Sequence, residues 1–193
     1  MRAIVEPPPS AYQYIAAGAP VRAVGSSAID GRVQMMPLDE GRPDAYSIIS
    51  QLQFLIDQFG RDPGVRAAAE RIVTTRINND VRRWMNTLTE WVRNHLTYVM
   101  DPDGAEYFQS PLVLLNRIFS GQNAYGDCDD HVLLLGALLV SVGIPVVVNG
   151  VKLPGATHFN HVILQAIVNG RAVDIDPVAK GMCPPTYSER LVA

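Results

Sequence analysis

The sequence predicts an α+β protein in which a helical N-terminal half packs on a small antiparallel sheet. Apolar residues recur at helical spacing from residue 44 to residue 142, and three β-rich runs follow Gly143. The last two runs are joined by Asn169-Gly170, which is a strong hairpin signal. Helices that precede antiparallel strands in this way are typical of the α+β class.

Five segments are predicted as helices because their apolar residues form a stripe or because a cap residue starts them. The predicted helices are 44–60, 62–75, about 80–96, a short one after Ser110-Pro111, and 128–142. The last of these is nearly all apolar after its first turn, so we expect it to be buried on most sides. Strands are expected at 146–148, 162–164 and 172–175, with turns at Asn149-Gly150 and Asn169-Gly170.

Three regions are predicted along the chain: an extended arm over 1–43, a folded domain over 44–177 and a C-terminal tail over 178–193. The first region holds six of the 14 prolines and shows no sustained periodicity. Proline removes backbone donors, so this region is either a flexible tail or an arm that wraps its own domain or a partner. We take the arm as the working hypothesis.

Composition excludes several classes of protein. The formal net charge of −3 gives no reason to expect a nucleic-acid partner. No apolar run is long enough for a membrane span, and the N-terminus lacks the apolar region of a secretory signal. Two cysteines, Cys128 and Cys183, are too few for a disulfide scaffold. We therefore expect a protein made in the cytoplasm, without a membrane span and not secreted by a signal peptide.

Cys128 is the candidate nucleophile. It follows Gly126-Asp127 at the start of the apolar helix, where unpaired backbone N–H groups and the helix dipole favour thiolate over thiol. A thiolate is the nucleophile that acyl transfer needs. The alternative is that Cys128 only packs, as most cysteines do.

His161 is the candidate base, and a carboxylate on the next strand is its candidate partner. Counted outward from Asn169-Gly170, His161 and Asp176 fall near the same end of the predicted hairpin. A carboxylate there would orient the imidazole. Asp174 lies on the same strand face as Asp176 and could take that role, and His158 competes with His161.

Two further interpretations stay open for these residues. A metal site could use Cys128, His131, His158, His161 and a carboxylate, although the close spacing typical of zinc sites is absent. The acidic cluster formed by Asp127, Asp129 and Asp130 could also have no role beyond stabilising the positive N-terminal end of the helix.

The segment Gly126 to His131, with the Leu-rich helix and Gly143-Ile144-Pro145 after it, resembles the nucleophile helix of the transglutaminase-like superfamily. Asn160-His161 and Asp176-Pro177 are similar to that family's histidine and aspartate motifs. Four short segments upstream of Gly126 resemble segments of the phage- and prophage-encoded members of this superfamily. They are Asp62-Pro63-Gly64-Val65-Arg66, Trp91-Val92-Arg93-Asn94-His95, Tyr98-Val99-Met100-Asp101-Pro102 and Gln109-Ser110-Pro111.

The resemblance implies a papain-like cysteine hydrolase or acyltransferase that acts on an amide or isopeptide bond of a protein or peptide. It implies Cys128, His161 and Asp176 as the catalytic triad, with no metal and no cofactor. The oxyanion donor would be Gln122, six residues before the cysteine as in papain-like proteases, or the backbone N–H of Cys128.

A second interpretation is a catalytically silent structural or assembly component of a bacteriophage particle, in its head or tail, that keeps the fold. Ala172 stands where the family usually has an aromatic residue, which favours this alternative. The arm would then bind phage structural proteins, and the chain would be virion-associated after synthesis in the host cytoplasm.

Overall fold

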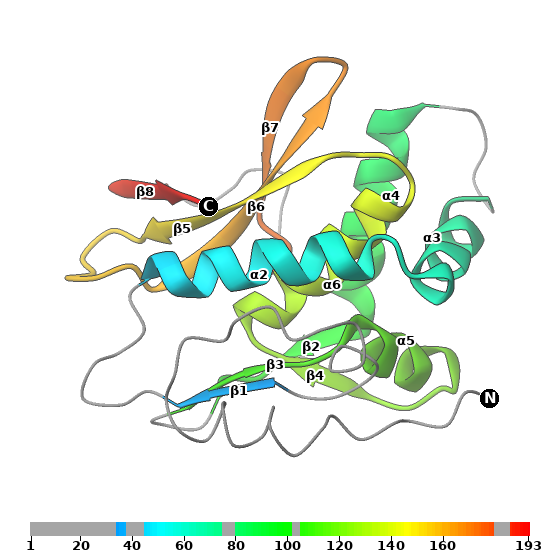
Figure 1. The fold of residues 1–193 in the computed structure, drawn as a ribbon, viewed down its shortest axis with the longest axis horizontal. Helices are drawn as coiled ribbons and strands as arrows, with labels where there is room; N and C mark the ends of the chain where they lie inside the picture. The colour runs from blue at the N-terminus through cyan, green and yellow to red at the C-terminus, as the bar shows by residue number, and fades with distance from the viewer. Residues whose placement is uncertain (1–33, 38–44, 75–79, 102–104, 180–185) are drawn as a thin grey trace.

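The computed structural model describes residues 34–37, 45–74, 80–101, 105–179 and 186–193. Within these ranges the chain forms five helices, a four-stranded antiparallel sheet and two short strand pairs. The predicted α+β class is confirmed. Figure 1 shows the sheet at the top left, the helices across the centre and right, and the two strand pairs below.

The helices begin and end close to their predicted limits. They are α2 (Ala45–Phe59), α3 (Pro63–Thr74), α4 (Val81–His95), α5 (Pro111–Phe119) and α6 (Cys128–Ser141). Side chains cap three helix starts: Asp62, as predicted, accepts from Gly64 N and Val65 N, Asp80 accepts from the N–H of Arg82 and of Arg83, and Ser110 Oγ accepts from Leu112 N. Side-chain oxygens thus satisfy backbone donors that a helix start leaves unpaired.

Helix α6 is the centre of the fold. Twelve of its residues are buried, and α2, α3, α4 and β6 all pack against it. Gly136 allows α2 to approach closely, because a Cβ built there would lie 2.5 Å from Cδ1 of Ile56. The continuous apolar sequence of this helix is therefore explained by neighbours on most of its sides, as predicted.

The four-stranded sheet has the order β7-β6-β5-β8. Its strands are β5 (Val146–Lys152), β6 (His161–Val168), β7 (Arg171–Ile175) and β8 (Glu189–Val192). The predicted hairpin between β6 and β7 is confirmed, with Asn169 at φ 51° and Gly170 at φ 72°. Both are left-handed conformations, and Asn-Gly is the pair that adopts them most readily in a two-residue turn.

The turn predicted at Asn149-Gly150 is wrong, because both residues lie inside β5. Asn149 is fully buried, its Oδ1 accepts from Arg190 Nε at 2.8 Å, and Gly150 pairs with Val162. These contacts replace the local ones that an Asn-Gly turn would make. The chain reverses after Lys152, in the segment that leads to His161.

The tail predicted over 178–193 is also corrected. Its last part, β8, pairs antiparallel with β5, from Lys152 opposite Glu189 to Asn149 opposite Val192. The chain end therefore completes an edge of the sheet (Figure 1). A strand of four residues with charged Glu189 and Arg190 carries little apolar periodicity, which is why the sequence does not reveal it.

The two strand pairs lie beside the start of α6. Strand β1 (Gln34–Pro37) pairs antiparallel with β3 (Ala105–Phe108), and β2 (Leu96–Tyr98) pairs parallel with β4 (Ala124–Gly126). None of these was predicted, because strands of three or four residues are too short to show a period. Most of the predicted arm, including residues 1–33 and 38–43, lies outside the described residues.

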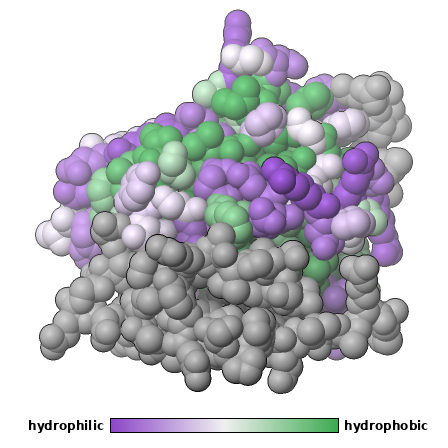
Figure 2. Space-filling view, in the orientation of Figure 1, coloured by the Kyte–Doolittle hydropathy of each residue, from purple (hydrophilic) through white to green (hydrophobic). Residues whose placement is uncertain are grey.

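The surface view in Figure 2 shows hydrophobic residues gathered over the strands of the sheet, above a band of hydrophilic residues.

Within the described chain the longest helices have 15 residues. A membrane-spanning helix would need about 20, and none of the described helices qualifies.

Candidate active site

Cys128 is the first residue of α6, directly after the short strand β4. Asp127 caps the helix, with its Oδ1 accepting from Asp129 N at 3.1 Å. The cysteine is half-buried. The structure thus places Cys128 where the sequence predicts it, in the first turn of the helix at the positive end of its dipole.

His161 and Asp176 form a hydrogen-bonded pair at one end of the sheet. His161 opens β6 and Asp176 follows β7, so the hairpin brings the two residues together. His161 Nε2 lies 2.8 Å from Asp176 Oδ2, and the side chains are only 11% and 3% exposed. The predicted hydrogen bond between these two side chains is confirmed.

Asp176 is held in its charged form. Burial acts to raise its pKa, but the hydrogen bond and charge of His161 and the N–H groups of Val178 and Ala179 outweigh this, so the pKa lies below its usual value. Those two N–H groups donate to Asp176 Oδ1 at 2.8 and 3.2 Å. Both oxygens of the carboxylate are therefore positioned, one of them toward His161.

Asp174, the other candidate carboxylate, forms hydrogen bonds that link strands of the four-stranded sheet. It accepts from Arg190 Nη2 at 2.9 Å and Nη1 at 3.1 Å, from Tyr187 Oη at 3.1 Å and from Gln165 Nε2 at 2.9 Å. Burial raises its pKa, and these bonds and the charge of Arg190 lower it more strongly. The alternative in which Asp174 binds His161 is wrong, because Asp174 joins β6, β7 and β8.

Asp130 ties the start of α6 to the chain that precedes α5. Its Oδ1 accepts from Gln109 N and its Oδ2 from Gln109 Nε2, each at 2.6 Å. Gln109 Nε2 also donates to the carbonyl of Tyr125 at 2.7 Å. Gly126 leaves the space for this, since a Cβ there would lie 2.5 Å from Asp130 Oδ2. Gln109 was not predicted to take part in the site.

Asp129 is fully buried, and within the described chain no N–H or O–H group donates to its carboxyl oxygens. Burial raises its pKa well above the usual value, and the neighbouring carboxyl groups of Asp127 and Asp130 add to the shift. With a proton in place, Asp129 can share a hydrogen bond with Asp127. Burial also raises the pKa of Asp130 to about 7, although the bonds from Gln109 oppose it.

The histidines of the zinc alternative lie in separate surroundings. The ring nitrogens of His131 face two backbone carbonyls, with Nδ1 2.6 Å from Asp127 O and Nε2 3.2 Å from Leu96 O. His158 is exposed beside Thr157. Within the described ranges the acidic and His/Cys side chains that come within 4.8 Å as a group are Asp127, Asp129 and Asp130, so the residues of the alternative zinc site are not brought together.

The pKa of His131 is also affected by the negative charge of Asp176. Burial lowers the pKa of His131, while the carbonyls of Asp127 and Leu96 and the charges of Asp127 and Asp176 act in the opposite direction. His131 lies one turn after Cys128. The first turn of α6 and the His161–Asp176 pair therefore lie within electrostatic reach of each other.

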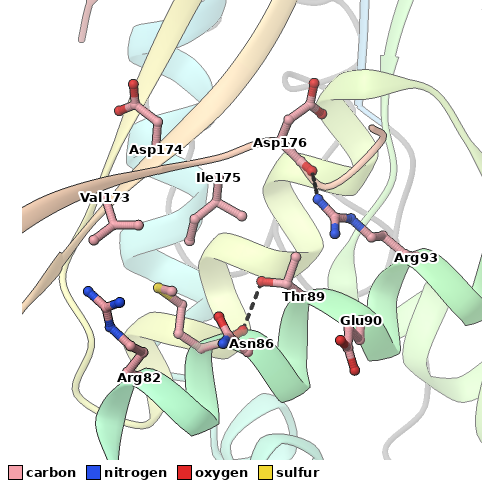
Figure 3. A pocket seen from close by; sticks show the side chains of 10 residues that line it. Arg82, Asn86, Thr89, Glu90, Arg93, Val173, Asp174, Ile175 and Asp176 are labelled. Carbon is pink, nitrogen blue, oxygen red and sulfur yellow. Dashed lines mark hydrogen bonds between the residues drawn. The ribbon is translucent and has the colours of Figure 1, made fainter. Parts of the chain in front are cut away.

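A groove of about 210 Å³ lies between α4 and β7, next to this pair. Arg93 lines it and donates from its guanidinium to the backbone carbonyl of Asp176 (Figure 3). Val173 and Ile175 point toward α4, whereas the carboxylates of Asp174 and Asp176 point away from the groove. Arg93 therefore supports the main chain that carries Asp176, a role that nothing in the sequence pattern predicted.

Gln122, the predicted oxyanion donor, is exposed in the segment between α5 and β4. Its backbone N–H donates to Arg117 O at 2.9 Å, which ends α5. Strand β4 and the Asp127 cap lie between Gln122 and Cys128 in the sequence, and the role of Gln122 as oxyanion donor stays a prediction.

No family model and no curated protein matches this chain. Among solved structures, it is similar to a candidate protease from Parabacteroides distasonis ATCC 8503, with 17% identity, a TM-score of 0.46 and coverage of 69% of this chain and 26% of that one. It is also similar to a candidate cysteine protease from Cytophaga hutchinsonii, with 14% identity, a TM-score of 0.46 and coverage of 83% and 62%. The chain thus spans less than two thirds of either protein. Likenesses of this size bear on neither activity nor substrate.

Proposed function

We propose that this chain is a transglutaminase-like cysteine hydrolase or acyltransferase with Cys128, His161 and Asp176 as its triad. The observation that carries the proposal is the 2.8 Å bond between His161 Nε2 and Asp176 Oδ2. That bond leaves Nδ1 as the ring nitrogen that would serve the thiol. Packing of α6 against β6 supports it, since these elements begin at Cys128 and His161.

The proposed reaction is acyl transfer through a thioester. His161 takes the proton of the Cys128 thiol, and the thiolate forms a bond to the carbonyl carbon of an amide or isopeptide. The tetrahedral intermediate collapses as the carbon–nitrogen bond breaks, and the imidazolium gives its proton to the leaving amine. Water or a second amine then attacks the thioester and releases Cys128. Asp176 holds the imidazole in the tautomer that this sequence requires.

The buried acids beside the cysteine are compatible with a thiolate. Negative charge next to a thiol opposes its ionisation, and three aspartates flank or follow Cys128. Because the pKa values of Asp129 and Asp130 are raised, to about 7 for Asp130, both carboxyl groups carry less negative charge at neutral pH than exposed aspartates would. The negative charge near the thiol is thus smaller than the sequence suggests.

The substrate would be a protein or peptide, and the catalytic unit would span residues 44–177 together with β8. The proposal requires no cofactor, because the thiol, imidazole and carboxylate supply nucleophile, base and orienting group. The phage relationship rests on the sequence resemblance alone. On that relationship, the chain would be synthesised in the host cytoplasm and would be associated with the virion.

Labelling with iodoacetamide tests the proposal without knowledge of the substrate. We expect Cys128 to be alkylated at pH 7 at least tenfold faster than glutathione, because an activated thiol is partly ionised there. Peptide mapping by mass spectrometry distinguishes Cys128 from Cys183, and Cys128→Ala is the control. The wild type should also release 4-nitrophenolate from p-nitrophenyl acetate, and Cys128→Ala should not. Alkylation no faster than that of glutathione would leave the silent structural component as the better interpretation.

A further inference from the structure

Tyr98 lies on the strand that borders the start of α6. In the parallel pair β2–β4 it stands opposite Gly126, and the N–H of Val99 donates to Gly126 O at 3.0 Å. Leu96 and Ala124, which face each other in the same pair, are both buried. Because side chains alternate along a strand, Tyr98 shares the face of Leu96, the face turned to the core.

The ring of Tyr98 reaches the first turn of α6. Its centroid lies 6.1 Å from that of His131, with the planes inclined at 39°. Burial raises the pKa of Tyr98 to about 12, and the nearby charges of Cys128, Asp127 and Asp129 add to this shift. The phenol therefore keeps its proton at neutral pH. The side chain is also 46% exposed, so a ligand can reach it.

We propose that the hydroxyl group of Tyr98 donates a hydrogen bond to the oxyanion that forms when Cys128 attacks a carbonyl, which makes Tyr98 a fourth catalytic residue. The inference rests on the proposed function. The predicted donor Gln122 is exposed, and the amide of Gln109 is bound to Asp130 and the Tyr125 carbonyl. Tyr98 is a side-chain donor that reaches the first turn of α6, where its ring contacts that of His131.

Stabilisation of the oxyanion requires a hydrogen-bond donor that keeps its own proton. As the bond between sulfur and carbon forms, the carbonyl π electrons move to oxygen, and the new negative charge accepts hydrogen bonds from Tyr98 Oη and from the backbone N–H of Cys128. When the intermediate collapses, the electrons return and the carbon–nitrogen bond breaks. The Tyr98 proton stays on the phenol throughout, so no further acid or base is needed.

The substitution Tyr98→Phe tests this with two reagents that use the same thiol. p-Nitrophenyl acetate is attacked at a carbonyl and passes through an oxyanion, whereas iodoacetamide alkylates the thiolate by displacement of iodide at a saturated carbon and forms none. We expect Tyr98→Phe to slow acylation of Cys128 by p-nitrophenyl acetate about 10- to 100-fold, toward the loss typical of a missing oxyanion donor. Alkylation by iodoacetamide should stay within twofold of the wild type.

Tyr125→Phe is the matched control, because Tyr125 is 43% exposed and lies on the neighbouring strand but on the opposite face. It should leave both rates unchanged. Equal rates of acylation in Tyr98→Phe and the wild type would overturn the inference. An equal loss of rate with both reagents would also overturn it, because Tyr98 would then act on the reactivity of the thiolate and not on the oxyanion. Failure of the proposed function looks different: wild-type Cys128 would react slowly with both reagents.

Discussion

Asp176→Asn is expected to slow acylation of Cys128 by p-nitrophenyl acetate by about two to four orders of magnitude, in line with the loss of the orienting carboxylate from other triads. Asp176 Oδ2 lies 2.8 Å from His161 Nε2. A carboxylate can only accept there, so it holds the proton on Nε2 and keeps Nδ1 as the base. An asparagine that presents its NH₂ group instead would favour the wrong tautomer. The measurement is the rate of 4-nitrophenolate release at pH 7.

Asp174→Asn is the matched control, two residues earlier in the chain and within β7. It breaks bonds to Arg190 and Tyr187 that fasten β8 to the sheet. We expect a lower melting temperature and acylation within a few-fold of the wild type. Equal losses of acylation in the two variants, or a larger loss in Asp174→Asn, would contradict the role given to Asp176.

The free energy of unfolding is expected to fall by about 1–2 kcal/mol between pH 6.5 and pH 8, at about 1.4 kcal/mol per pH unit for each proton. The pKa values of Asp129 and Asp130 are raised by burial, so above about pH 4 the folded protein holds protons that the unfolded chain has lost. Stability then decreases as pH rises through this window. His131 has the opposite sign, because its pKa is lowered, but it acts only below about pH 6.5.

Asp129→Asn should give a flatter profile and a higher free energy of unfolding at pH 8 than the wild type. Within the described residues no donor is lost by the change, since none points at the Asp129 oxygens. Chemical denaturation at pH 6.5 and pH 8 measures the effect, with the exposed Glu70→Gln as control. A wild type that becomes more stable over this range, or an Asp129→Asn variant with an unchanged slope, would contradict it.

Helices were predictable from the sequence because their signals are local. A cap such as Asp80 or Ser110 acts within three residues, and the apolar stripe of each helix repeats over several turns. The Asn169-Gly170 turn was predictable for the same reason. The identical dipeptide at Asn149-Gly150 lies within a strand, because Arg190, 41 positions away, satisfies the Asn149 side chain. A contact at that separation leaves no local pattern.

The same limit separates the parts of the candidate site. Cys128, His161 and Asp176 stand at the ends of predicted elements, so their approximate placement follows from strand pairing and helix start. Gln109 and Arg93 support them through contacts with Asp130 and Asp176 that span 21 and 83 positions. Such contacts depend on how α4 and α5 pack against α6. Packing of that kind is set by side-chain volumes across the whole core.

The most direct measurement is the distance between Cys128 Sγ and His161 Nδ1 in a crystal structure of the full chain. The proposed triad predicts about 4 Å or less, within the looseness of a site without substrate. It also predicts that the His161–Asp176 bond is kept. A separation near 10 Å, or an imidazole whose Nδ1 points to the opposite face of the sheet, would contradict the triad and with it the proposed function.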